Sequence, residues 1–458
     1  MAAIKTDSLT ATQQQIRERH IVSLEKNRAL RFKKVYDAVG YTEEEVEEKI
    51  REINSKGIVR MTLLMYAKYE VFRYEDKALE DFLKLIAHRN LLKNKILTEF
   101  KHMDSGTRNS DDIKGLIDEY YQIIEEIMPE SLYEELAERL LLSYPNLKDS
   151  NEKYRRAAID MEATRVLLSF SLTEYVVYHF YEKDLFERWT FISDEERLRV
   201  INKINDPKCF DMLDNKWMAY NLLRKYYGRK ITLIKSEEDF KAFKGICKRN
   251  KFLVLKPPCG TQGQGIKAVR VPFGFKKRAL FETLTAEDTE ILVEELIKPH
   301  KKISALNPDS VNTVRLVTYY DGKETSIQNA FMKVGQKGSF IDNGAAGGIL
   351  VSINTETGML DSDGRDENGI VYKQHPHTHI IFNGYQLPDW NKAIALGHEL
   401  ADKVPGLKYV GWDITYTDDN QWIVVEGNAK TQFMGQQAPT DKGIRKEFLE
   451  AVKYKTKK

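Results

Sequence analysis

The chain has 458 residues, too many for one ordinary hydrophobic core, so two or three domains are expected. Hydrophobic residues make up 42% and charged residues 31%, which is typical of a globular protein and not of a disordered chain. The 71 basic and 69 acidic residues leave a net charge of +2, so charge alone gives no reason to expect nucleic acid or an anionic membrane as partner.

The cysteines and the apolar stretches indicate a cytoplasmic protein without a membrane span. Cys209, Cys247 and Cys259 have spacings that fit neither a disulfide framework nor a CxxC zinc site. The N-terminus lacks the apolar core of a signal peptide. No stretch reaches the roughly 20 apolar residues of a spanning helix. The most apolar segment, residues 166–181, carries Ser, Thr, Glu and His and is predicted to be a buried amphipathic helix.

Residues 1–205 are predicted to form a helical N-terminal domain. The segment is poor in glycine, and its apolar positions recur every three or four residues. Residues 42–45 (Thr-Glu-Glu-Glu) and 193–196 (Ser-Asp-Glu-Glu) have the pattern of a capping box, in which a hydroxyl and a glutamate three residues later satisfy free N–H groups. We expect this domain to shape an acceptor site, bind a carrier protein or form a homodimer.

From about residue 230 the pattern changes to short strands with intervening helices. Predicted strands are 231–234, 252–256, 267–271, 290–296, 313–320, 327–334, 347–353, 409–415 and 422–426. Predicted helices are 237–249, 275–284 and 391–404. The turns at 321–322 and 418–420 each separate two apolar runs, as hairpin turns do. The fold class is therefore α+β, with mainly antiparallel pairing.

A glycine-rich loop follows the apolar run that Lys256 ends. Gly260, Gly263 and Gly265 let backbone N–H groups approach phosphate oxygens, and the lysine would neutralise the same phosphates. The loop leads into a strand, whereas a P-loop or Rossmann turn opens a helix. A glycine-rich hairpin without a ligand is the alternative.

Glu294 and Glu295 end the next apolar run. A carboxylate at this position could accept a hydrogen bond from a ribose hydroxyl or an adenine amino group. The alternative is that these residues only mark where a strand leaves the core.

The C-terminal hairpin predicts a metal site. Glu426 and Asn428 are two residues apart on one strand, so their side chains face the same side, and Asp413 could join them from the neighbouring strand. Two carboxylates and an amide oxygen suit Mg²⁺, whereas buried acids without a metal would be costly.

Arg315 is a single guanidinium inside the apolar strand 311–317. A buried arginine needs an anionic partner, and its planar fork suits a carboxylate or a phosphate. A structural ion pair is the alternative.

In this order along the chain, these features resemble the ATP-grasp superfamily. Six phrases are closest to its sugar-transfer-associated branch: 309–315 (DSVNTVR), 343–349 (NGAAGGI), 375–378 (HPHT), 387–390 (LPDW), 411–414 (GWDI) and 426–428 (EGN). The resemblance covers about residues 205–440. It implies two α+β subdomains that clamp ATP, with a catalytic module over 206–445 and a lid subdomain over about 230–295. Residues 446–458 are predicted to be a basic C-terminal tail.

By position, the resemblance implies roles for the nucleotide residues. Lys216 would contact phosphate, and Lys256 would reach the α-phosphate and the adenine edge. The loop Gly260–Gly265, with Gln262 and Gly263, would close over the triphosphate. Glu294 or Glu295 would bind the nucleotide at the hinge.

For the metal, the resemblance implies that Asp413, Glu426 and Asn428 hold one or two Mg²⁺ ions, with Mn²⁺ as a substitute. Arg315 would stabilise charge on the transferring phosphoryl group.

The resemblance also implies an acceptor side, where Asn312 and the segment 344–348, with Gly347 and Gly348, would lie. The chain departs from the family after Asn428, where relatives have a Pro-Gly turn and this chain has Lys430 and further polar residues that could bind an anionic substrate. His375, in a family phrase, is expected in a structural or substrate-loop role and less so as a zinc ligand.

The sequence predicts a Mg-ATP-dependent ligase that activates a carboxylate as an acyl phosphate and joins it to an amine or other nucleophile. The carboxylate would be a small molecule or carrier-bound, in polysaccharide or peptide-type natural product modification. The alternatives are a kinase acting on a sugar or polyol hydroxyl and a catalytically idle nucleotide-binding protein. Every lysine and metal position is present, which disfavours the idle protein.

Overall fold

The computed structural model describes residues 76–104, 113–128, 136, 140, 141, 144, 147, 151–248, 250–260, 265–272, 274, 276–286, 290–340, 342, 344 and 347–453. The chain divides into two compact units, Met1–Ala163 and Thr164–Lys458. The boundary at residue 205, the lid limits and the tail stay predictions. The capping box predicted at 42–45 lies outside the described residues.

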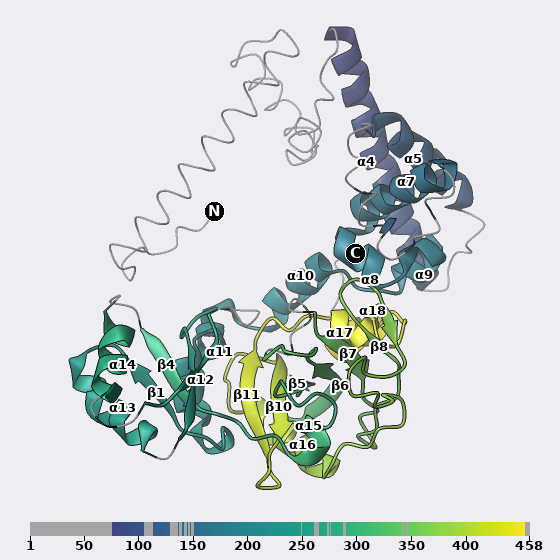
Figure 1. The fold of residues 1–458 in the computed structure, drawn as a ribbon. Coiled ribbons are helices and arrows are strands. Elements are labelled where there is room, and N and C mark those ends of the chain that lie inside the picture. Colours follow the sequence, from purple (N-terminus) through teal and green to yellow (C-terminus); the bar gives the residue numbers. More distant parts are fainter. Residues whose placement is uncertain are drawn as a thin grey trace. The chain divides into compact units, whose positions relative to one another are not determined.

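The described part of the first unit is helical (Figure 1). Its helices are α4 (Asp76–Asp104), α5 (Lys114–Ile127) and the first part of α7 (Asn151–Leu168). Ile96 and Phe100 of α4 and Tyr120 and Ile124 of α5 are buried, as apolar residues at helical spacing predict.

The second unit begins with short helices before its first strand. They are α8 (Leu172–Val177), η3 (Phe180–Glu182), α9 (Leu185–Trp189), α10 (Asp194–Ile204), η4 (Pro207–Cys209), α11 (Asp211–Asp214), α12 (Lys216–Leu223) and η5 (Arg224–Tyr226). Ser193 caps α10 by accepting from the Glu196 N–H at 3.2 Å, as predicted. The Glu196 carboxylate instead pairs with Arg445 at 3.1 Å, so the predicted return bond of the capping box was wrong.

The single amphipathic helix predicted over 166–181 was also wrong. The segment contains the end of α7, then α8 and η3, and the breaks fall at Ser169 (φ 62°) and His179 (φ 51°). Left-handed backbone is incompatible with a continuous right-handed helix. Among the described residues, no helix is long and apolar enough to cross a membrane.

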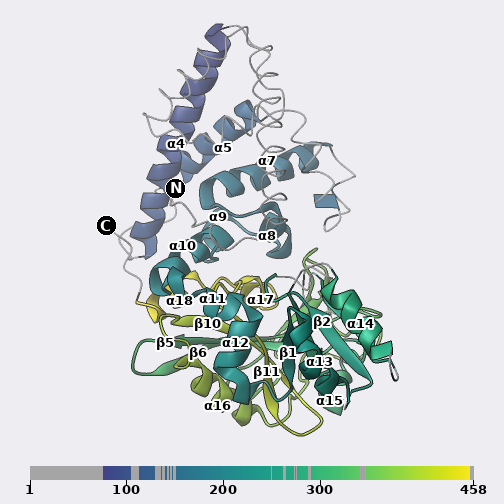
Figure 2. The ribbon, with the colours of Figure 1, turned by 90° about the vertical axis from the view of Figure 1, so that its left-hand side faces the viewer.

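The first sheet has four antiparallel strands in the order β1-β4-β2-β3. The strands are β1 (Ile231–Ile234), β2 (Phe252–Lys256), β3 (Lys267–Arg270) and β4 (Ile291–Glu295). After η6 (Glu237–Asp239), α13 (Phe240–Cys247) and then α14 (Lys276–Thr285) lie beside this sheet (Figure 2). Phe243, Phe281 and Leu253 are fully buried in the core between these helices and the sheet.

The second sheet is larger, with the order β11-β10-β5-β6-β7-β8-β9. Its strands are β5 (Thr313–Tyr320), β6 (Thr325–Val334), β7 (Ile349–Ser352), β8 (Gly364–Arg365), β9 (Val371–Tyr372), β10 (Tyr409–Tyr416) and β11 (Trp422–Asn428). Helix α16 (Trp390–Ala401) packs on this sheet, and α15 (Lys301–Ser304) follows the connection from β4. Near the C-terminus lie α17 (Met434–Gln437) and α18 (Arg445–Ala451), and Phe448 of α18 is buried against Tyr409 and Phe433.

The predicted strands and helices of 230–430 all form, with ends displaced by a few residues. Both predicted hairpins are present, joining β5 to β6 and β10 to β11. The two-residue strands β8 and β9 were not predicted, because two residues are too few to show the alternation of apolar and polar side chains that indicates a strand.

Candidate nucleotide and metal site

The predicted metal residues lie in one row across three neighbouring strands. Asp413 on β10 is directly opposite Glu426 on β11, and on its other side it is opposite Arg315 on β5. Directly opposed residues on one face of a sheet bring their side chains together. The Asn428 amide lies 3.5 Å from Asp413 Oδ2. The structure thus brings together the three predicted metal ligands and the predicted arginine.

Asp413 is held by two cations. Arg315 Nη2 donates to Oδ2 at 3.0 Å, its Nε donates to Oδ1, and Lys333 Nζ on β6 donates to Oδ2 at 2.9 Å. Asp413 is 5% exposed. Burial raises the pKa of Asp413, but Arg315 and then Lys333 outweigh burial and lower that pKa to about 2. The carboxylate is therefore ionised at neutral pH.

Gly411, two residues before Asp413, leaves space for the Arg315 side chain. A Cβ on Gly411 would lie 2.7 Å from Arg315 Cδ and 2.3 Å from Thr431 Oγ1, so only glycine leaves room for the arginine. Thr431 Oγ1 in turn accepts from Arg315 Nη1 at 3.0 Å.

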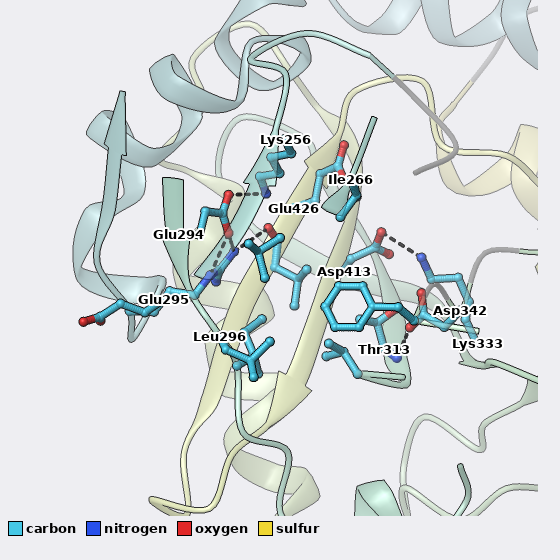
Figure 3. A pocket seen from close by; sticks show the side chains of 16 residues that line it. Lys256, Ile266, Glu294, Glu295, Leu296, Thr313, Lys333, Asp342, Asp413 and Glu426 are labelled. Atoms are coloured by element: carbon cyan, nitrogen blue, oxygen red, sulfur yellow. Dashed lines mark hydrogen bonds and ion pairs between the residues drawn. The ribbon is translucent and has the colours of Figure 1, made fainter. Parts of the chain in front are cut away.

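A cavity opens between the two sheets beside this row (Figure 3). Its polar part contains Lys256, Glu294, Lys333, Asp413 and Glu426. Its apolar lining is formed by Val254, Ile266, Leu296, Ile297, Val311, Phe340 and Val425. A cavity with both apolar side chains and charged groups in its lining suits a ligand that is part aromatic ring and part polyanion.

Glu294 faces into the cavity from β4 and is buried (Figure 3). It pairs with Lys256 Nζ from β2 and accepts from Arg229 Nε at 3.0 Å. Burial raises the pKa of Glu294, but Lys256 and Arg229 together lower it below its ordinary value. Burial also lowers the pKa of Lys256.

Glu295 is directed away from these groups (Figure 3). Its carboxylate accepts from the Lys230 N–H at 2.8 Å and from Asn250 Nδ2 at 3.0 Å. Successive residues of a strand point to opposite faces, so only one of the two glutamates can face the polar end of the cavity. The geometry favours Glu294.

Lys216, at the start of α12, connects the glycine loop with the metal residues. Its Nζ donates to Gly260 O at 2.6 Å and lies 3.4 Å from Glu426 Oε1. Gly260 (φ 138°) and Gly265 (φ 75°) adopt backbone conformations that favour glycine. Gln262 and Gly263 lie outside the described residues.

A second cavity adjoins the same row of side chains. It shares Lys333, Asp413 and Glu426 with the first cavity and is lined further by Asn428 and Lys430. Lys430 is exposed and bonded to Asp214 at 2.9 Å. Gly344 also lines this cavity, and the Gly347 N–H donates to Gly344 O at 2.8 Å. Gly348 is buried next to β7.

Two of the predicted acceptor-side residues are bonded within the core. His375 is fully buried: its Nε2–H donates to Gly335 O at 3.0 Å, and Nδ1 accepts from the Thr378 N–H at 3.2 Å. Asn312 is fully buried too, and Nδ2 donates to Asn307 O at 2.6 Å while Oδ1 accepts from the Gly335 N–H at 3.2 Å. The geometry gives both a structural role.

Sequence reasoning did not identify Lys333, Arg229 or Asp342 as site residues. Lys333 and Arg229 each hold a site carboxylate, and Asp342 accepts from the Thr313 N–H at 2.6 Å in the cavity wall. Lys333 could have been identified because it is a single charged residue inside the apolar run 330–334. The same pattern indicated Arg315.

The fold and site define a protein with two antiparallel sheets and a charged cavity between them. The family model described as sugar-transfer associated ATP-grasp matches residues 195–454, more than half of the chain. The chain therefore belongs to this family, and the predicted family and fold class are confirmed. No curated protein sequence matches it.

Solved structures similar to the chain include one ligase and two synthetases. The ATP-grasp ligase PsnB, complexed with minimal precursor, Mg and ADP, is 16% identical over 57% of this chain and 65% of that chain, with a TM-score of 0.34. D-alanyl-alanine synthetase A from Vibrio cholerae is 12% identical over 54% and 66%, with a TM-score of 0.34. The ADP complex of N5-carboxyaminoimidazole ribonucleotide synthetase is 13% identical over 60% and 57%, with a TM-score of 0.31. The chain thus spans just under two thirds of the PsnB chain.

Proposed function

We propose that the protein is a Mg-ATP-dependent ligase that activates a carboxylate as an acyl phosphate and joins it to an amine. The observation that carries the proposal is the row Glu426–Asp413–Arg315. Its two carboxylates line the cavity that Lys256 and Glu294 enter from the other sheet, and Arg315 lines the adjoining cavity. Anionic oxygen ligands, cations and apolar side chains in one cavity suit a nucleoside triphosphate with Mg²⁺.

The lining of the cavity favours one orientation of the proposed nucleotide. The apolar lining at Leu296 and Ile297 would take the adenine ring, and Glu294 would accept from the nucleotide at the hinge. The triphosphate would then run towards Lys256 and the row of strand residues, with Lys216 and the loop Gly260–Gly265 beside it. Cations and backbone N–H groups there would balance the phosphate charge.

The donor set fits Mg²⁺. Asp413 and Glu426 are opposed on neighbouring strands, and Asn428 lies beside them. These are hard oxygen donors, few enough that nucleotide phosphates would complete the shell. When bound, Mg²⁺ would neutralise phosphate charge and orient the terminal phosphoryl group; Mn²⁺ would substitute.

Phosphoryl transfer and the amide-forming step both require positive charge near the reacting oxygens and correct positioning of the substrates. A substrate carboxylate oxygen attacks the terminal phosphorus, and ADP leaves. Arg315 and Lys333 would stabilise the equatorial oxygens in this step and the oxyanion in the next. The neutral amine nitrogen then attacks the acyl carbon, the carbon–oxygen bond to phosphate breaks, phosphate leaves, and the nitrogen loses one proton to solvent. No protein nucleophile is required.

A trapping screen tests the proposal. The protein is incubated with Mg-ATP, concentrated hydroxylamine and a panel of carboxylic acids, including uronic acids and amino acids, and hydroxamate and ADP are measured. A ligase gives both in equal amounts with the true acid. Asp413→Asn is the inactive control, and Asp419→Asn, exposed on the β10–β11 turn, is the matched active control.

Two results would oppose the proposal. Stable phosphate on a sugar or polyol in a parallel assay would identify a kinase. ATP binding without turnover of any acid would identify an idle nucleotide-binding protein. Cytoplasmic location and homodimer formation through the helical domain are also proposals, and light scattering tests the latter.

A further inference from the structure

The second cavity lies where an acceptor would have to bind. It shares Lys333, Asp413 and Glu426 with the nucleotide cavity, so a molecule inside it would contact the residues that surround the transferred phosphoryl group. The lining of this cavity also contains the carboxylate of Glu367, to which no role has been assigned above.

The cations of this cavity already have anionic or carbonyl partners. Arg315 and Lys333 both bind Asp413. Lys430 binds Asp214 at 2.9 Å. Arg197 pairs with the carboxylate of Asp194 at 2.8 Å and donates to a backbone carbonyl at 2.6 Å. The described cations are therefore compensated.

Glu367 differs from these residues because it has no hydrogen bond or ion pair with any described residue. It is partly buried, and burial, then the neighbouring Asp366, raises the pKa of its carboxyl group. Residues 341, 343, 345 and 346 lie outside the described part of the chain, and none of them is a cation in the sequence. A partly buried carboxylate without a cation favours a ligand that brings positive charge.

The turn that carries Glu367 is held firmly. The buried Asp366 carboxylate accepts from the N–H groups of Asn368 and Ile370, both at 2.9 Å. Gly369 has φ 76°, and its carbonyl accepts from His179 Nε2 at 2.6 Å. The backbone that carries Glu367 is thus held in place, which reduces the entropy lost when a ligand binds there.

The Glu367 carboxylate lies beside Gly344. A Cβ on Gly344 would lie 2.4 Å from Glu367 Oε1, so the absence of a side chain at 344 makes room for this carboxylate. Glycine at 344 is thus explained by the position of Glu367, since nothing in its backbone conformation requires it.

We propose that the second cavity is the acceptor subsite and that Glu367 binds the ammonium group of a primary-amine acceptor. This inference rests on the proposed ligase function and deepens it by naming the acceptor as a cationic amine. The carboxylate holds the ammonium group in the cavity that contains the acyl-phosphate end of the site. The ammonium group loses one proton to solvent before its nitrogen attacks. An uncharged nucleophile gains nothing from the carboxylate.

The test compares a charged with an uncharged nucleophile. With the acid selected by hydroxylamine trapping, kcat/KM is measured for a panel of α-amino acids and primary amines, and for hydroxylamine, which is uncharged at neutral pH. Glu367→Gln is expected to lower the ratio of amine to hydroxylamine kcat/KM about 10- to 100-fold, mainly through a higher amine KM. Gly344→Ala, which displaces the carboxylate, is expected to lower the same ratio. Glu356→Gln, an exposed acid, is the control and should leave it unchanged.

The outcomes separate the two claims. The subsite is overturned if Glu367→Gln keeps the ratio of amine to hydroxylamine kcat/KM within twofold of wild type. It is also overturned if the wild-type protein couples only uncharged nucleophiles. Both results leave the ligase function intact. No hydroxamate from wild type with any acid overturns the ligase function and this inference with it. An amine KM that rises in Glu367→Gln and is partly restored in Glu367→Asp supports the subsite.

Discussion

Replacing Asp413 by asparagine removes the negative charge between Arg315 and Lys333 while keeping the shape of the side chain. Both largely buried cations then lose the carboxylate with which they pair directly. The substitution also removes a proposed Mg²⁺ ligand. We therefore expect two separate effects, a lower free energy of unfolding without ligand and the loss of Mg²⁺-dependent nucleotide stabilisation.

The size of the first effect follows from the structure. The pKa of Asp413 is lowered from 3.8 to about 2. This difference corresponds to about 2 kcal/mol of preference for the ionised carboxylate in the folded state. Breaking a buried ion pair by removing one partner costs about 3–5 kcal/mol. A loss of about 2–5 kcal/mol lowers the melting temperature by roughly 3–8 °C in a domain of this size.

Thermal unfolding measures both effects. Wild type, Asp413→Asn and the exposed control Asp419→Asn are melted alone, with a non-hydrolysable ATP analogue, and with the analogue plus Mg²⁺. We expect Mg²⁺ to add stabilisation in wild type and the control but not in Asp413→Asn. A variant that melts within 1 °C of wild type would refute the proposed ion-pair energetics, and a Mg²⁺ increment of wild-type size would refute the metal assignment.

Four further outcomes are expected. Because the folded-state pKa of Asp413 is depressed, its stabilisation is present above pH 3.8 and is lost as pH falls through about 2, so the melting difference between wild type and Asp413→Asn should shrink over that range; a constant difference would contradict this. Lys256→Met should raise the Kd for ATP at least about tenfold in calorimetry, and an unchanged Kd would remove Lys256 from the site. His375→Ala should cost about 2–4 kcal/mol in denaturant unfolding with ATP affinity unchanged, whereas full stability with impaired acceptor use would contradict a structural role. Gly411→Ala should displace Arg315 and lower hydroxamate formation at least about tenfold while ATP affinity holds, and full activity would argue against the role of Arg315.

Much of the fold could be predicted because local pattern decides it. The β-rich runs of the second half formed the expected strands, and Glu426 and Asn428 face one side because strand side chains alternate. The hairpin turn at 418–420 then brought Asp413 opposite Glu426. These relations depend on neighbouring residues or on one short connection.

The rest depended on pairings between distant segments. Lys333 reaches Asp413 only because β5 lies between β6 and β10, an order that spacing along the chain does not contain. The choice between Glu294 and Glu295 required the orientation of β4, and the buried bonds of His375 required its contact with Gly335. Alternation and composition carry no information about such partners.

The central claim is that ATP activates a carboxylate at the Asp413 row, and an isotope measurement tests it most directly. The acid selected by trapping is labelled with ¹⁸O in its carboxylate and turned over with Mg-ATP and the acceptor, and the released phosphate is analysed by mass spectrometry. Because an acyl phosphate transfers one carboxylate oxygen to phosphate, the account predicts one ¹⁸O in each phosphate released. Unlabelled phosphate formed alongside the coupled product would contradict it.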